Sequence, residues 1–168
     1  MAANKYMSQV GGKLKEVTAS VTSTPNALVA ADSTGRIDAT MMPVGIGAEI
    51  ITGIASEAIS AGAFVNEYNN SGVVTFRNAD CTTNGKKAIG FVLAAVASGG
   101  IASVYTLSQT NTQLSGLTIG ADYFLSTIGT ISLSQPVPPT GVLSQLLGQA
   151  ISTTSLIFSN LLTIELAV

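Results

Sequence analysis

The feature that most restricts the fold of this chain is an internal repeat, because one pattern of turns and short apolar runs occurs twice. The matched segments are 60–66 with 118–124, 88–90 with 146–148, and 103–105 with 156–158, the last after a deletion of about five residues. Gly72 and Gly129 fall in near-equivalent turns. A strand, a turn, a glycine-led strand, a loop and a closing strand thus recur in order. This predicts a duplicated β unit whose two halves share one core.

Short runs of strand-forming residues, separated by turn residues, fill the chain from Ala48 onward. Ten strands are expected, at 50–54, 64–68, 73–77, 90–95, 102–107, 123–126, 130–133, 147–151, 156–159 and 162–166. The stretch 69–72 (NNSG) is typical of a hairpin turn. Two copies are too few for a solenoid, so the pattern predicts an all-β fold, an antiparallel β-barrel or sandwich. We expect one β-barrel domain at 47–168, with repeat halves at about 58–107 and 117–159.

Residues 1–46 differ in charge and composition from the rest of the chain. They hold four of the seven basic residues and carry a net charge of +1, against −3 for residues 47–168. The run 17–24 (VTASVTST) favours strand but has too few large apolar side chains to form a core. A small hairpin is expected near 28–38, since Asp32 can open a turn and Gly35 can supply positive φ. We interpret the segment as an extended N-terminal arm that orders against a neighbour.

The apolar side chains of this arm are the predicted contacts to a neighbouring protein or to other subunits. Proline and glycine oppose a helix in 41–47 (MMPVGIG), and flexible thioethers suit a contact made on docking. Met41 and Met42 are equally well explained by packing on their own domain. The predicted contact residues are Tyr6, Met7, Val10, Leu14, Val17, Met41, Met42, Pro43 and Val44.

Charge is scarce in this chain, at 10% of residues beside a mean hydropathy of +0.48. A soluble domain usually carries about 25% charged residues, so something else must cover the exterior. Neutral polar side chains supply part of that cover, with 19 threonines and 18 serines. Protein supplies the rest if the chain is held in an assembly. The composition therefore favours a structural subunit over a catalyst.

The residue types needed for common catalytic and cofactor sites are largely missing. The sequence has no histidine and one cysteine, Cys81, so neither a histidine-based triad nor an imidazole or thiolate metal site can form. The acidic residues are not spaced as a calcium loop, and the Gly-Lys pairs lack the spacing of a phosphate-binding loop. Without a basic stripe or an aromatic platform, nucleic-acid binding is not expected. We expect no enzyme activity, no cofactor and no metal.

One apolar run, 88–107, follows two lysines and superficially resembles a membrane-spanning helix. Ser98-Gly99-Gly100 interrupts it, and residues 103–107 alternate polar and apolar at the period of a strand. The second copy of the run is rich in serine and threonine, which a spanning helix does not favour. No membrane contact is expected. Residues 1–8 lack the apolar core of a secretory signal, which predicts assembly in the host cytoplasm.

Several segments resemble phage structural proteins. Residues 28–47 (LVAADSTGRIDATMMPVGIG) resemble a segment of virion structural proteins of tailed bacteriophages. Residues 59–66, 88–96 and 114–126 resemble the β modules of small head-decoration or fibre proteins. The resemblance spans nearly the whole chain and implies a capsid-bound, non-enzymatic homotrimer, but it supplies no functional residues to transfer.

Two functions are consistent with this resemblance. The leading hypothesis is a capsid decoration, or cement, protein that binds the major capsid protein on the capsid exterior of the virion. There it would stabilise the head by bridging capsomers. The alternative is a receptor- or glycan-binding fibre or tail module that recognises a host glycan through neutral polar loops.

Overall fold

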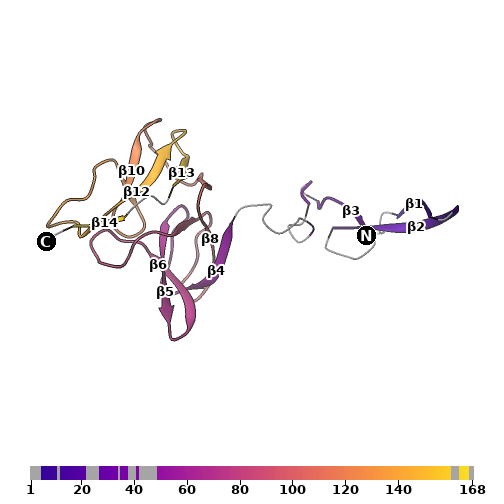
Figure 1. Cartoon of the computed structure of the whole chain (residues 1–168), viewed down its shortest axis with the longest axis horizontal. Helices are drawn as coiled ribbons and strands as arrows, with labels where there is room; N and C mark the ends of the chain where they lie inside the picture. The colour runs from indigo at the N-terminus through magenta and orange to yellow at the C-terminus, as the bar shows by residue number, and fades with distance from the viewer. Residues whose placement is uncertain are drawn as a thin grey trace. The chain divides into compact units, whose positions relative to one another are not determined.

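The structure is a computed structural model that describes residues 5–10, 12–21, 27–33, 35–37, 41, 49–159 and 163–166. Strands β1 to β14 make up its regular structure, which confirms the predicted all-β fold (Figure 1). Backbone contacts divide the chain into a first unit, Met1–Gly47, and a second unit, Ala48–Val168.

The first unit contains a three-stranded sheet in the order β1-β2-β3. β1 (Lys5–Val10) and β2 (Lys13–Ser20) form an antiparallel ribbon, and β3 (Leu28–Val29) pairs with β2 in parallel. The ribbon turns in two residues, and Gly12 has a φ of 77° there. Wherever the burial of a side chain is described in this unit, that side chain is exposed or only partly buried.

Beyond β3, Asp32 organises a closed turn. The amide of Asp32 donates to the carbonyl of Arg36 at 2.7 Å, and the amide of Arg36 donates back to the Asp32 carboxylate at 3.0 Å. Gly35 lies in this turn with a φ of 79°. The strand before the turn, β3, finds its partner in β2.

Eleven strands follow in the described part of the second unit, and each of the ten predicted strands has a counterpart among them. They are β4 (Ile50–Ala55), β5 (Phe64–Asn70), β6 (Val73–Asn78), β7 (Gly90–Val92), β8 (Ile101–Tyr105), β9 (Thr110–Asn111), β10 (Asp122–Leu125), β11 (Ile131–Ser132), β12 (Leu143–Ala150), β13 (Leu156–Phe158) and β14 (Thr163–Glu165). The first five close a barrel in the order β4-β6-β5-β7-β8. The others form a curled sheet in the order β11-β10-β12-β13-β9, with β14 paired to β12. Figure 1 shows these two groups within the unit.

The two groups are copies of one topology. If β9 is matched to β4, β10 to β5, β11 to β6, β12 to β7 and β13 to β8, the strand order is the same in both. The hydrogen bonds at the repeat turn are also duplicated. The amide of Ala63 donates to the Ser60 carbonyl, and that of Ala121 to the Thr118 carbonyl, both at 3.1 Å. The duplication predicted from sequence is therefore a duplication of structure.

Only the first copy closes into a barrel. There β4 is six residues long and pairs in parallel with β6. Its counterpart β9 has two residues, because the side chain of Asn111 ends the strand. Asn111 accepts a bond from the amide of Gln113 and donates one to the carbonyl of Gly62, at 3.1 and 2.8 Å. Among the described strands β9 pairs with β13 and not with β11, so the second copy stays open.

The open copy wraps around the outer wall of the barrel. The barrel interior is filled by its own apolar residues, among them Val65, Phe76 and Val104. A second cluster combines Phe64 and Phe91 of the barrel with residues of the open copy, including Phe158. The ring centroids of Phe64 and Phe158 lie 5.6 Å apart. The shared core predicted for the two halves is thus this inter-copy cluster.

Two details of the sequence analysis are wrong. The halves do not form one continuous barrel, because the second copy must remain open to receive Phe64 and Phe91. The final repeat match is shifted by one residue. Phe91 pairs with Tyr105 and its counterpart Gln149 pairs with Ile157, so Tyr105 corresponds to Ile157 and not to Phe158. The shared aromatic character of Tyr105 and Phe158 misled the alignment, although they occupy opposite faces of the repeat.

Candidate functional site

The β1–β2 ribbon positions the predicted contact residues of the arm. The register pairs Tyr6 with Val17 and Val10 with Lys13, whereas Met7 pairs with Glu16 and Leu14 with Gln9. Because side chains alternate along a strand, Met7 and Leu14 share one face of the ribbon. The predicted contacts therefore divide between two faces and do not form one continuous patch.

Met7 and Leu14 are the most exposed large apolar side chains described in the ribbon, at 65% and 72%. They lie on neighbouring strands near the closed end, diagonally across the pairs Met7–Glu16 and Gln9–Leu14. Val17 is partly buried, and so is Met41. The remaining predicted contacts, Met42, Pro43 and Val44, lie outside the described residues.

Sequence reasoning missed several parts of this surface. Exposed apolar side chains also occur at the end of β2 and on β3, at Val21, Leu28 and Val29. The ribbon itself was not expected, although the signal was present. Two glycines, Gly11 and Gly12, separate two runs in which apolar and polar residues alternate.

In the second unit, β4 and β8 carry an uncharged outer face. Ile54 pairs directly with Ile101 across the two strands, and Ile50 pairs with Tyr105. All three isoleucines are exposed. Thr52 and Ser103, which also pair, complete the face. This wall of the barrel is apolar and bears hydroxyl groups, in keeping with the composition of the chain.

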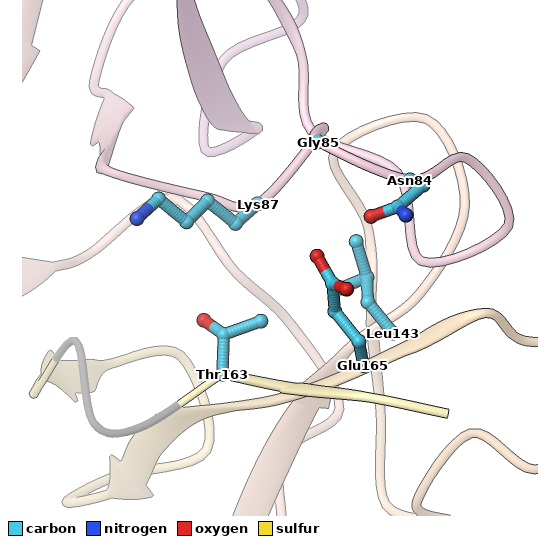
Figure 2. A pocket seen from close by; sticks show the side chains of 6 residues that line it. All are labelled: Asn84, Gly85, Lys87, Leu143, Thr163 and Glu165. Carbon is cyan, nitrogen blue, oxygen red and sulfur yellow. The ribbon is translucent and has the colours of Figure 1, made fainter. Parts of the chain in front are cut away.

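A small pocket of about 250 Å³ lies between the 84–87 loop and strands β12 and β14. Lys87, Glu165 and Asn84 bring one ammonium, one carboxylate and one amide to its lining. Figure 2 shows the Lys87 side chain extending away from the Glu165 carboxylate, and the two form no ion pair. Leu143 provides an apolar wall. The pocket can hold a small polar group, but the described residues place no nucleophile with an activating base in it.

The sole cysteine lies in the inter-copy core. Cys81 is 6% exposed. Its amide donates to the carbonyl of Ser126, and its carbonyl accepts from the amides of Val142 and Leu143. Burial, reinforced by the neighbouring Asp80 carboxylate, raises the pKa of the Cys81 thiol. These contacts give Cys81 a structural position at the junction of the two copies.

The described residues contain neither a cluster of metal-ligating side chains nor a helix of membrane-spanning type. Residues 49–159 and 163–166, with the described parts of the first unit, hold no cluster of three His, Cys, Asp or Glu side chains suited to a metal ion. In the same residues no helix is long and apolar enough to cross a membrane.

Comparison with solved structures finds chains of similar fold. The fold is similar to the head fiber gp8.5 N base of bacteriophage phi29, with a TM-score of 0.43 and 16% identity over 66% of this chain and 93% of that one. With a TM-score below 0.5, this likeness does not by itself assign a role to the chain. The sequence matches no protein-family model and no curated protein.

Proposed function

We propose that the chain is a non-enzymatic structural protein of a phage virion, a capsid decoration or cement protein that binds the outer surface of the head and bridges capsomers. One observation carries this proposal. The described part of the first unit is an ordered β ribbon that exposes the apolar side chains of Met7 and Leu14. The resemblance of residues 28–47 to phage virion proteins supplies the class of partner.

A ribbon of this kind is not expected to be stable alone. A hairpin without a packed face is marginal in water, and three short strands need a hydrophobic face to persist. Full burial of a methionine or leucine side chain is worth about 1.5–3 kcal/mol relative to its exposure. Docking of the Met7–Leu14 face on another protein would therefore stabilise both the contact and the ribbon.

Weak contacts of this size suit a protein that attaches at several points. The resemblance implies a homotrimer, and three arms linked to one body raise the effective concentration of each arm at its site. An arm that reaches a neighbouring capsomer would then hold two capsomers together. The second unit provides a rigid body for such arms, because its two copies share one core.

The test is sedimentation of the full-length protein with purified heads that lack it. We expect the wild type to sediment with the heads and the double variant Met7→Ser, Leu14→Ser to lose at least tenfold in affinity. Lys13→Ser, next to Leu14 in β2 but on the opposite face of the ribbon, is the matched control and should bind as the wild type does. Deletion of residues 1–46 should leave a folded second unit that does not bind. Binding of the deletion variant at full stoichiometry would refute the model.

The alternative, a glycan-binding fibre or tail module, is favoured by one groove. It has a volume of about 320 Å³ and is lined largely by neutral polar side chains, including Ser126, Thr127, Ser134 and Gln135. Electron microscopy of the intact particle separates the two functions. A decoration protein covers the shell in hundreds of copies, whereas a fibre module occupies one location in small multiples.

A further inference from the structure

The basic residues of the second unit are gathered in one place. This unit has three, Arg77, Lys86 and Lys87, against six acidic residues. Arg77 lies on β6, and the two lysines lie in the loop before β7. Although the unit is acidic overall, its three basic residues therefore lie on two segments that Asn66 joins, and these residues, with the supporting side chains Asn66 and Tyr68, are defined here as the platform.

Asn66 ties the platform together. Its side chain is almost completely buried, at 2% exposure. The Oδ1 atom accepts from Nε of Arg77 at 2.9 Å, and Nδ2 donates to the carbonyls of Lys87 and Gly85 at 2.9 and 3.2 Å. One amide thus fixes the arginine and the lysine loop relative to each other.

The guanidinium group of Arg77 is held in a defined orientation. It lies over the ring of Tyr68, with Cζ 4.5 Å from the ring centroid, while Nε is bonded to Asn66. Within the described residues the two Nη groups have no hydrogen-bond partner, and Arg77, Lys86 and Lys87 form no ion pair. A stacked, oriented guanidinium loses little conformational freedom when a carboxylate binds its open edge.

We propose that this platform binds an acidic patch of the protein on which the second unit sits, with Arg77 holding an Asp or Glu carboxylate through its Nη groups. The inference rests on the proposed function. It gives the protein a second attachment point, in addition to the Met7–Leu14 face of the ribbon. A body that is negative overall, with all its cations on one patch, is turned by electrostatics so that this patch meets an acidic surface.

An acidic protein surface fits the platform better than a nucleic acid does. Binding to a phosphate backbone generally uses a stripe of many cations, and affinity grows with the number of phosphates neutralised. Here there are three cations on a unit of net charge −3. Such a platform can orient one or two carboxylates but would repel a polyanion beyond them.

The experiment measures binding of the full-length protein to purified heads between low and high NaCl. Arg77→Gln is expected to weaken binding about tenfold at low salt and to flatten its salt dependence. Arg77→Lys keeps the charge but loses the two-pronged geometry, so it should recover only part of the affinity. Lys87 contacts Asn66 only through its backbone carbonyl, so Lys87→Gln should leave that contact in place. This variant should also weaken binding, and it tests the platform even if Arg77→Gln disturbs the fold. Arg36→Gln, an equal loss of charge outside the platform, should bind within twofold of the wild type.

The outcomes are distinguishable. Wild-type affinity in both Arg77→Gln and Lys87→Gln overturns the platform while leaving the proposed function intact. An equal loss of affinity in Arg36→Gln also overturns the platform, because it would indicate a general effect of charge. Two results would assign the platform to another partner and also overturn the inference. One is a change in the oligomeric state of Arg77→Gln, measured by light scattering. The other is binding of the wild type to duplex DNA that is lost in Arg77→Gln. Failure of the wild type to bind heads at all overturns both proposals.

Discussion

Buried amide side chains hold together segments that are far apart in the sequence. Gln145 is fully buried and pairs with the backbone of Ala88 through two hydrogen bonds of 2.7 Å. Asn111 joins β9 to the first repeat turn at Gly62, and Asn66 joins Arg77 to the 85–87 loop. A buried amide that satisfies backbone groups is costly to replace, because the donors and acceptors it leaves behind lie away from water. These residues therefore specify the arrangement of the two copies.

Cys81 gives a prediction at the same scale. Its raised pKa means that the folded protein keeps the thiol proton to higher pH than the unfolded chain, whose thiol titrates near 9.0. The stabilising effect is fully present below that pH. Above it, stability should fall by at most about 1.4 kcal/mol per pH unit until the folded thiol also titrates.

Urea unfolding of the wild type and of Cys81→Ala between pH 7 and 10.5 checks this. The variant should lose the part of the slope that belongs to the thiol. In native buffer at pH 8, a thiol reagent should modify Cys81 at least about 100-fold more slowly than in urea. Rapid labelling of the folded protein would contradict the buried position.

Single residues were the least predictable part of the molecule. The sequence predicts Asn66 to be a strand residue and leaves Gln145 just outside the strand expected at 147–151. It does not indicate that either is buried, since burial depends on which distant backbone lies opposite. The contact role of Met7 and Leu14 stays a prediction, to which the strand register adds that the two side chains share one face of the ribbon. Tyr68 and Arg77 are seen as a pair only once β5 and β6 are placed in register.

Among the elements, β7 and β12 each contain a glycine at the matched position of the repeat, Gly90 and Gly148. Gly148 on β12 has a φ of 148°, and an added Cβ would overlap the carbonyl of Ile157 on β13. Gly90 occupies the same place on β7, where a Cβ would overlap the carbonyl of Tyr105. Close approach of neighbouring strands thus requires glycine at both positions.

We predict that Gly148→Ala destabilises the protein by about 3 kcal/mol or more, because both the backbone angle and the strand contact must change. Gly99→Ala is the control. Gly99 also has a positive φ, of 80°, but nothing lies within 4 Å of its added Cβ. It should cost about 1 kcal/mol. Equal urea midpoints for the two variants would show that strand contact is not the cause.

The positions of the strands and of the repeat were largely predictable from the sequence. The closure of one copy into a barrel was not. The hairpin at 69–72 and the repeat turns carry glycines at defined offsets, so their positions can be read from the sequence. The two-residue strand β9 has no such signal, because it is defined by its pairing with β13. Whether a copy closes depends on the turn at Asn111 and on the aromatic residues that fill the other copy, and both are tertiary facts.

For the whole second unit, we predict one cooperative unfolding transition that includes both copies, since they share a core. Phe91→Ala should lower the stability of both by about 3–5 kcal/mol. Hydrogen exchange followed by mass spectrometry should show equal acceleration in peptides from β5–β8 and from β10–β13. Phe91→Leu, which retains most of the buried volume, should have a smaller effect. Unchanged exchange in β10–β13 would contradict a common core.

The copies differ most at the positions through which they associate. Phe64 and Phe91, on the outer wall of the barrel, are replaced in the open copy by Asp122 and Gln149, which are exposed. A third module that approached the open copy would thus meet a charge and an amide where aromatic rings are needed. At the other end, a closed barrel offers no concave surface to fill. Head-to-tail growth through this interface therefore stops at two modules.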